Sequence, residues 1–278
     1  ERLNELAASD SAVPGLSTGL PDVDMAISGL NKSDLILLAA RPGMGKTSFA
    51  LNMLLHAGKF SGKTVVFFSL EMSREQLAMR LISGESFVDN KKLVTGKLGE
   101  EDWTKIAAAS AALNQTQILI DDNPSLSVAD MNAKCRRVDN LGLVVIDYLQ
   151  LMTSAGGPTR SGDNRQQIVS DISRALKIMA KELNVPVVCL SQLSRGPESR
   201  SDKRPMLSDL RESGAIEQDA DIVMFLYRDD YYNDSDENHN LAECIIAKNR
   251  HGETRTVELQ WLPEYTTFSS IDRRHIEY

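Results

Sequence analysis

The organisation of this chain turns on the ten residues Ala39-Ala40-Arg41-Pro42-Gly43-Met44-Gly45-Lys46-Thr47-Ser48. The apolar run before them, residues 35–38, predicts a buried strand, and residues 49–55 after them predict a helix. A glycine-bearing loop that ends in Gly-Lys-Thr and joins a strand to a helix is the arrangement that a phosphate-binding loop requires. The flanks favour this interpretation over a glycine-rich turn that binds nothing, which is the alternative.

The residue types in this loop suit phosphate chemistry. Gly43 and Gly45 let the backbone curl so that its N–H groups point at phosphate oxygens, and the helix that follows adds its positive end. We expect Lys46 to reach the β- and γ-phosphates of ATP and the Thr47 hydroxyl to hold Mg²⁺. The pattern's first glycine is Ala40 here, so the strict pattern is not met. The residues expected to bind the nucleotide are Arg41, Gly43, Met44, Gly45, Lys46, Thr47 and Ser48.

Composition limits the class of protein. The chain has 278 residues, enough for one large core, and its net charge of -8 counts against a broad basic surface for nucleic acid, although a local basic channel is compatible with it. No apolar run is long enough for a membrane span, and no signal peptide is visible. The chain starts at Glu1 rather than Met, which favours a fragment of a longer protein.

The cysteines and histidines do not form a metal site by spacing. Cys135, Cys189 and Cys244 are far apart and odd in number, which favours free thiols in a reducing compartment, and hence a cytoplasmic protein. The four histidines show no ligand spacing and are expected at the surface.

Predicted strands alternate with predicted helices along most of the chain. The strands are expected at residues 35–38, 64–70, 117–121, 143–147, 185–191 and 220–227, and the helices at 20–27, 49–55, 74–82, 100–113, 127–139 and 164–183. Such alternation predicts one α/β domain with a mostly parallel sheet covered by helices. Residues 241–248 and 254–261 predict an antiparallel pair joined by a turn at residues 249–252.

Polar residues follow three of the predicted strands, at the edge where sites in α/β folds gather. Asp147 is expected to hold Mg²⁺ through water. The next residue is Tyr148 rather than Glu, so the carboxylate that activates water must lie elsewhere, and Glu71 is the best candidate. Gln192 is suited to contact the γ-phosphate or the water. The alternatives are a charge at a helix N-terminus for Glu71 and a surface polar residue for Gln192.

Several ordered motifs together resemble the C-terminal motor domain of the DnaB replicative helicases, over about residues 15 to 261. They are Ala39-Ala-Arg-Pro-Gly-Met-Gly-Lys-Thr47, Phe68-Ser-Leu-Glu-Met72, Ile146-Asp-Tyr-Leu-Gln-Leu-Met152, Leu190-Ser-Gln-Leu193 and Asp209-Leu-Arg-Glu-Ser-Gly-Ala-Ile-Glu-Gln-Asp-Ala-Asp221. The resemblance implies a RecA-like P-loop fold, a hexameric ring, and 5′-to-3′ movement on single-stranded DNA driven by ATP and Mg²⁺, with unwinding at the replication fork. It also implies primase and a helicase loader as partners, and no membrane.

The resemblance assigns roles residue by residue. Lys46 and Thr47 become the phosphate and metal residues, Glu71 the catalytic carboxylate, Asp147 the Mg²⁺ aspartate and Gln192 the γ-phosphate sensor. Lys248 and Arg250 become finger residues that reach the ATP of a neighbouring subunit, although by themselves they read as solvated cations on a turn. Arg211, Glu212 and Gly214 match the DNA-contacting loop, although they also fit the start of a short helix. No arginine is clearly placed to act in cis, and Arg41, within the loop itself, is the exception to consider.

Full-length family members carry an N-terminal helical domain that nothing here matches. Residues 1–14 are therefore expected to be the remnant of a linker helix and loop, and residues 15–278 the motor. Two rival functions share the phosphate loop: a RecA-like recombination or regulatory ATPase, and a structural ATPase without unwinding. Lys248, Arg250 and the stretch from Asp209 to Asp221 favour the helicase over the first, and Glu71 and Gln192 argue against the second.

Overall fold

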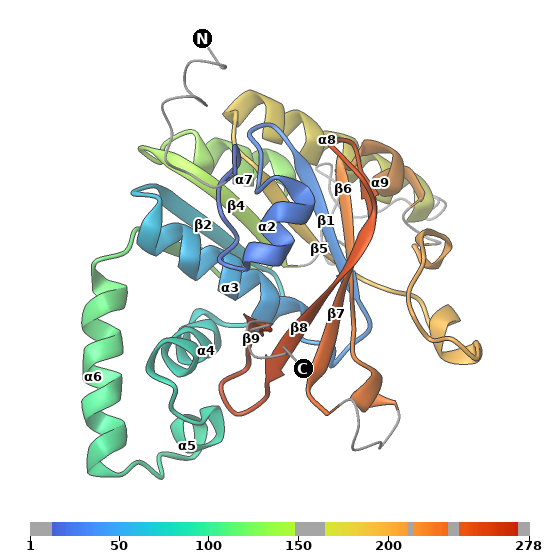
Figure 1. The fold of residues 1–278 in the computed structure, drawn as a ribbon. Coiled ribbons are helices and arrows are strands. Elements are labelled where there is room, and N and C mark those ends of the chain that lie inside the picture. Colours follow the sequence, from blue (N-terminus) through green and yellow to red (C-terminus); the bar gives the residue numbers. More distant parts are fainter. Residues whose placement is uncertain (1–12, 148–164, 211–213, 233–238, 272–278) are drawn as a thin grey trace.

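A single sheet of nine strands forms the centre of the molecule in the residues that the computed structural model describes, which are 13–147, 165–210, 214–232 and 239–271 (Figure 1). The strand order is β3-β2-β4-β5-β1-β6-β7-β8-β9. The first six strands in that order are parallel, and β7, β8 and β9 are antiparallel to their neighbours. The predicted mostly parallel α/β sheet with an antiparallel C-terminal pair is confirmed. The strands are β1 Leu35–Ala40, β2 Thr64–Ser69, β3 Ile118–Asp121, β4 Leu141–Asp147, β5 Val187–Gln192, β6 Ile222–Tyr227, β7 Leu241–Asn249, β8 Arg255–Leu262 and β9 Thr267–Ser270.

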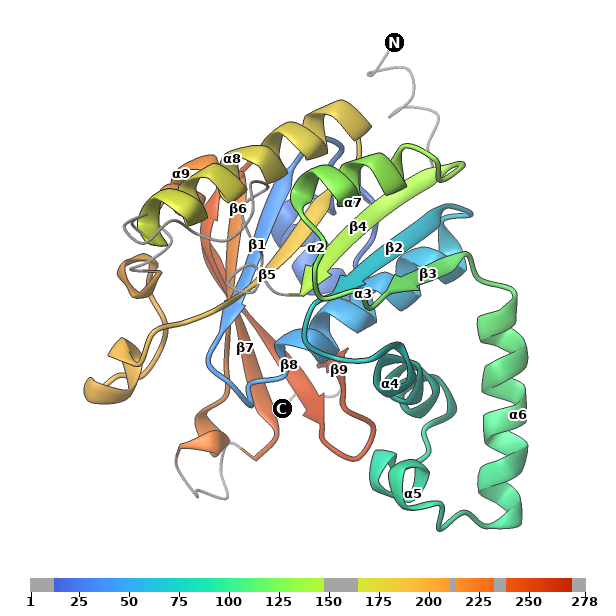
Figure 2. The same cartoon turned by 180° about the vertical axis from the view of Figure 1, so that it is seen from behind.

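Helices cover both faces of this sheet. Figures 1 and 2 show α2 and α3 on one face and α7, α8 and α9 on the other. Each face has its own apolar core: Phe67 points to the α3 side, whereas its neighbour Phe68 points to the α8 side, as alternation along a strand requires. The helices are α2 Pro21–Ile27, α3 Lys46–Phe60, α4 Arg74–Ser86, α5 Asn90–Thr95, α6 Glu100–Asn114, α7 Val128–Cys135, α8 Arg165–Leu183 and α9 Gly214–Asp219, with 3-10 turns η2 Gly196–Ser199, η3 Leu207–Asp209 and η4 Asp229–Tyr231.

The central strands are buried along their whole length. Every residue of β1, β2 and β6 is buried. A parallel strand covered by helices on both faces has no solvent side, which is why these segments read as continuous apolar runs rather than alternating ones. The carboxyl ends of the six parallel strands consequently share one edge of the sheet.

The helices α4, α5 and α6 follow the end of β2, and α4 packs Leu77 and Leu81 into the core on the α3 side. A capping box opens α4, with Gln76 Oε1 accepting from the Ser73 N–H at 3.1 Å and Ser73 Oγ accepting from the Gln76 N–H at 3.4 Å. Figure 2 shows α6 extending away from the sheet, and Trp103 on it is 59% exposed. The helical pattern at residues 100–113 therefore predicted the element but not its outlying position.

Two short elements were not predicted from the sequence. The six-residue α5 and the four-residue β9 were not predicted, because neither spans enough residues to show a period. The predicted helix at 127–139 is shorter than expected and ends at Cys135, and Ser127 and Asp130 form a capping box at its start. Residues 1–12 of the predicted linker lie outside the described residues. Among described residues, no helix combines the length and apolarity that crossing a bilayer requires.

Candidate functional site

The predicted phosphate loop joins the carboxyl end of β1 to the first turn of α3. Gly43 has φ 82° and Gly45 has φ 92°, values that L side chains rarely adopt, and Gly45 is the N-cap of α3. Close packing also demands glycine: a Cβ on Gly43 would lie 2.8 Å from the Tyr231 ring, and a Cβ on Gly45 would lie 2.8 Å from the Phe268 ring. The loop is therefore held in a curled shape at a helix N-terminus, where anions bind.

Three side chains converge beneath this loop. Thr47 Oγ1 donates to Asp147 Oδ2 at 2.7 Å, and Lys46 Nζ lies 3.6 Å from Asp147 Oδ1. Asp147 is 1% exposed, and its Oδ1 has no hydrogen-bond partner. Residues 100 apart in sequence thus form one cluster, as predicted, in which a buried carboxylate oxygen lacks a hydrogen-bond donor.

This cluster suits Mg²⁺ held jointly with a nucleotide. Mg²⁺ in nucleotide sites takes one or two protein oxygens and completes its shell with water and phosphate. The Thr47 hydroxyl and the orphaned Asp147 oxygen are such ligands. No group of three or more His, Cys, Asp or Glu among the described residues could hold a metal without a nucleotide.

The structure brings Glu71 and Gln192 to the same edge. Ser69 pairs with Asp147 in the β2–β4 register, and the Leu70 N–H donates to the Asp147 carbonyl at 2.7 Å, so Glu71 follows directly beside Asp147. Gln192 pairs with Ala40, the residue before the loop. Both side chains are exposed, which leaves them accessible to a bound nucleotide.

Arg80, on α4, is a cation that sequence analysis missed. Burial lowers the pKa of Arg80, and the negative charges of Asp147 and Glu71 oppose that shift. Its guanidinium thus lies within electrostatic reach of both carboxylates of the site. The sequence did carry a signal for Arg80. It lies next to Leu81 and three residues after Leu77, both buried, on a helix that starts just past Glu71, so the spacing indicates a side chain near the inward face of that helix.

Other residues of the loop have different surroundings from those expected. Arg41 donates to Glu198 Oε1 at 2.7 Å and to the Leu193 carbonyl at 2.8 Å, so its side chain ties the loop to the segment after β5. Met44 is 1% exposed and packs into the core on the α3 side. Ser48 is also buried. Contact of these three residues with a nucleotide stays a prediction.

Lys248 and Arg250 lie at the opposite edge of the sheet. Asn249, between them, pairs with Ile222, the first residue of β6, and Ile222 pairs with Ile36 near the start of β1. The six residues of β1 span roughly 20 Å, so these cations cannot reach the phosphate loop of their own chain. The turn was predicted, but Arg250 was expected to project outward. Instead its Nη2 donates to the Gln218 carbonyl in α9 at 2.7 Å, because that helix end lies beside the turn.

Of the predicted DNA-contacting residues, only Gly214 is described. It is the first residue of α9, and therefore the alternative reading of this stretch as a helix start is correct for its backbone. Arg211 and Glu212 lie outside the described residues.

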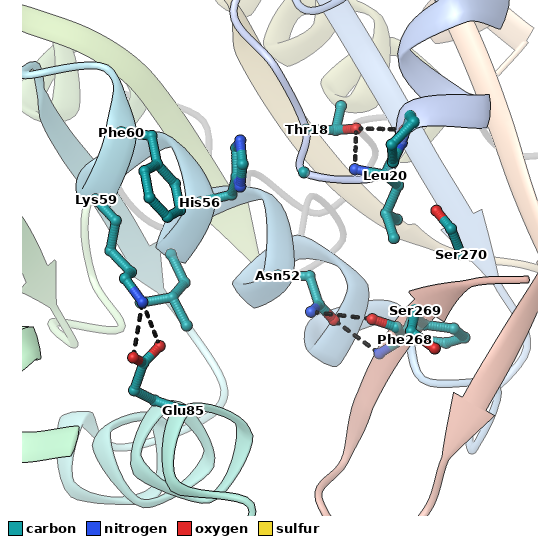
Figure 3. A pocket seen from close by; sticks show the side chains of 13 residues that line it. Thr18, Leu20, Asn52, His56, Lys59, Phe60, Glu85, Phe268, Ser269 and Ser270 are labelled. Atoms are coloured by element: carbon teal, nitrogen blue, oxygen red, sulfur yellow. Dashed lines mark hydrogen bonds and ion pairs between the residues drawn. The ribbon is translucent and has the colours of Figure 1, made fainter. Parts of the chain in front are cut away.

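A separate pocket of about 350 Å³ lies on the distal half of α3 (Figure 3). His56 and Phe60 of α3 line it together with Thr18 and β9, and Lys59 pairs with Glu85 at 2.7 Å on its margin. Burial lowers the pKa of His56. The lining contains no predicted phosphate or metal residue, so this hollow is not the nucleotide site.

Comparison with known proteins decides the family. The family described as "DnaB-like helicase C terminal domain" matches residues 15–270. The chain belongs to this family.

Individual DnaB-like proteins match across the whole chain. The replicative DNA helicase DnaB of Geobacillus stearothermophilus is 51% identical over 280 residues, covering 100% of this chain and 61% of the relative. The replicative DNA helicase DnaC of Bacillus subtilis is 50% identical over 277 residues, covering 99% and 60%. The chain thus spans about three fifths of the length of the curated relatives it matches.

Solved structures agree with the DnaB-like assignment. One, described as an ATPase domain, matches with a TM-score of 0.90 and 40% identity, covering 97% of this chain and 96% of that one. A DnaB-like replicative helicase, described with its interactions with primase, matches with a TM-score of 0.90 and 40% identity, covering 97% and 66%. The RadB recombinase matches with a TM-score of 0.58 at 17% identity, covering 92% and 100%, which shows a shared fold alone. The predicted RecA-like fold is confirmed, and the DnaB-like family is favoured over a recombinase.

Proposed function

We propose that this chain is the ATP-driven motor of a replicative DNA helicase, which moves 5′-to-3′ on single-stranded DNA and unwinds the duplex at the fork. The observation that carries the proposal is the convergence of Lys46, Thr47 and Asp147 at a helix N-terminus in a member of the DnaB-like family. Residues 15–278 form the motor, and residues 1–14 are the end of a linker.

ATP hydrolysis is assigned to residues at the carboxyl edge of the sheet. The backbone of the loop and Lys46 bind the phosphates, while Thr47 and Asp147 hold Mg²⁺. Mg²⁺, when bound, supplies positive charge beside the phosphates. Glu71 accepts a proton from the attacking water, and Gln192 contacts the γ-phosphate. The exposure of Glu71 and Gln192 at the edge that carries Lys46 and the buried Asp147 supports these roles.

Two sources of further positive charge are proposed. Arg80 acts in cis, since the charges of Asp147 and Glu71 in its own chain already act on its pKa. Lys248 and Arg250 act in trans on the nucleotide of the next subunit in a hexameric ring, because the length of β1 separates them from their own loop.

The partners follow from the family. Arg211, Glu212 and Gly214 contact the backbone of single-stranded DNA, and primase and a helicase loader bind the assembled ring in the cytoplasm. The relative described with its interactions with primase supports the first of these protein partners. The three cysteines are free and buried, and burial raises the pKa of each thiol to about 12, which suits a compartment where they stay reduced.

Unwinding of a forked duplex tests the proposal. We expect ATP-dependent strand separation by the wild type and none by Lys46→Ala.

Arg211→Ala should weaken single-stranded DNA binding roughly tenfold and lower the dependence of log affinity on log salt concentration by about one. It should also abolish DNA stimulation of the ATPase while DNA-free hydrolysis persists. Fluorescence anisotropy and phosphate release measure these effects.

The matched control is Arg136→Ala, which removes an arginine that pairs with Glu182 on the surface. Unchanged DNA affinity in Arg211→Ala would remove this segment from the DNA path. DNA-stimulated hydrolysis without strand separation would favour a translocase or recombination ATPase.

Arg80→Ala should lower ATP turnover by roughly 10²-fold, because a preorganised donor near developing charge is lost. Arg80→Lys should retain part of the rate. The control Arg74→Ala removes an arginine of the same helix whose side chain is 68% exposed and pairs only with Glu75 among the described contacts. Equal turnover in Arg80→Ala and Arg74→Ala would show that Arg80 does not act on the nucleotide.

A further inference from the structure

Lys248 and Arg250 both bind the C-terminal end of α9. Lys248 Nζ donates to the Glu217 carbonyl at 2.5 Å and to the Gln218 carbonyl at 3.3 Å. Arg250 Nη2 donates to the same Gln218 carbonyl at 2.7 Å. The last carbonyls of a helix have no partner within it, and cationic side chains commonly satisfy them. These two cations therefore cap α9.

A β-bulge aims Lys248 at α9. Along β6 and β7, Met224 pairs with Ile246, but Val223 pairs with Lys248, so one residue of β7 is extra. Ile246 faces the α3 side, and strict alternation would place Lys248 there too. Pairing with Val223 instead turns Lys248 to the face that carries α8 and α9.

Asp221 anchors the turn after β7 mainly through contacts that do not use the side-chain tips of Lys248 and Arg250. Its backbone carbonyl accepts from the Arg250 N–H at 2.9 Å, and its carboxylate accepts from the Leu35 N–H at 2.8 Å and from Lys177. Arg250 Nη1 reaches the same carboxylate at 3.4 Å. The side chains of Lys248 and Arg250 can thus leave α9 while the turn that carries them stays anchored.

The contacts with α9 are suited to exchange. The carbonyls at a helix end carry only partial negative charge, and Arg250 also reaches the single carboxylate of Asp221. A triphosphate carries several full charges and therefore competes with both kinds of contact. Two cations sharing the Gln218 carbonyl also repel each other, and burial together with Arg250 lowers the pKa of Lys248. The side chain of Arg250 is 49% exposed, which gives it a route to a neighbouring subunit.

The helix that they cap depends on outside support. A six-residue helix is unstable alone. Ser173 of α8 donates to Asp219 Oδ2 at 2.8 Å. Lys248 and Arg250 provide the other side-chain hydrogen bonds described at the C-terminal end of α9. Losing that pair should loosen the last turn, where the Ala220 N–H donates to the Ile216 carbonyl.

We infer that the C-terminal end of α9 is an intramolecular seat for Lys248 and Arg250, which they leave when they bind a neighbour's nucleotide. This inference rests on the proposed action of both cations in trans. Departure frees the C-terminal end of α9, the helix that begins at Gly214.

Hydrogen exchange on the whole chain tests the seat. Without nucleotide, Lys248→Ala should raise the exchange rate of amides 216–220 roughly tenfold, because hydrogen bonds to charged donors are among the stronger ones. Lys248→Arg keeps a donor and should keep most of the protection. The control Arg255→Ala removes a cation whose described contact is the Met25 carbonyl at 3.5 Å, and it should leave these amides unchanged.

The exchange step is tested in wild-type rings with and without AMP-PNP and Mg²⁺. We expect nucleotide to raise exchange of amides 216–220 in the wild type and to have no such effect in Lys46→Ala. The inference is overturned if amides 216–220 exchange at the wild-type rate in Lys248→Ala. It is also overturned if nucleotide does not alter their exchange in the wild type. Either result counts against it even if Lys248→Ala turns over ATP more slowly. If instead neither Lys248→Ala nor Arg250→Ala lowers turnover, the proposed action in trans fails, and the inference fails with it.

Discussion

Glu71→Gln should bind ATP as the wild type does and hydrolyse it roughly 10²- to 10⁴-fold more slowly, the usual contribution of a positioned general base. Glutamine keeps the size and polarity of glutamate but cannot accept the proton of the attacking water. Glu71 is exposed at the end of β2, so its replacement does not disturb the core. Phosphate release measures turnover, and equilibrium titration with a fluorescent ATP analogue measures affinity.

A neighbouring glutamate provides the control. Glu75 lies in the first turn of α4 with its side chain 66% exposed, and Glu75→Gln should leave both quantities unchanged. If ATP affinity of Glu71→Gln falls as far as turnover does, Glu71 supports the structure or the metal rather than activating water.

Arg250→Ala should give a folded protein that binds ATP but hydrolyses it about 10³- to 10⁵-fold more slowly, the range that a finger arginine contributes in phosphate-loop enzymes. The fold should survive because the Arg250 backbone still bonds to Asp221 and Lys248 still caps α9. ATP binding should survive because the loop lies at the other edge of the sheet. Turnover and nucleotide titration check both parts.

Mixing Arg250→Ala with Lys46→Ala separates action in trans from action in cis. Mixed rings contain interfaces with an intact Lys46 on one side and an intact Arg250 on the other, so part of the activity should return. Light scattering checks that rings form, and energy transfer between differently labelled variants checks that they exchange subunits. Exchange without any recovery would mean that Arg250 does not act in trans or that all interfaces must work together.

Doping Arg250→Ala into the wild type distinguishes those two explanations. Independent interfaces lose rate in proportion to the variant added. A strictly coordinated ring loses rate far more steeply, because one defective interface stops its neighbours.

Sequence analysis predicted the fold class and the centre of the site because their signals are local. The phosphate loop and Asp147 each come at the end of an apolar segment. Such segments become central parallel strands, whose carboxyl ends share one edge of the sheet. The meeting of Thr47 with Asp147 follows from that rule together with the short loop that joins β1 to the first turn of α3.

The features that the sequence did not predict depend on contacts between distant segments. Arg80 was overlooked because a helical position beside the apolar face does not show which charges surround it, and here the charges of Asp147 and Glu71 act on its pKa. Arg41 sits in the loop but turns to Glu198, a partner that only the path of the segment after β5 supplies. The four residues of β9 carry no detectable period, yet Phe268 on β9 closes over Gly45.

By itself, the sequence determined the phosphate loop, the parallel sheet and the carboxylates at its edge, since strand and helix periods and glycine conformations are properties of neighbouring residues. Only the tertiary structure decided where the long cations point. One extra residue in β7 turns Lys248 from the α3 face to α9, and the packing of α9 beside that strand places a carbonyl within reach of Arg250. Long side chains have many rotamers, and the partner that selects among them is set by which elements meet in space.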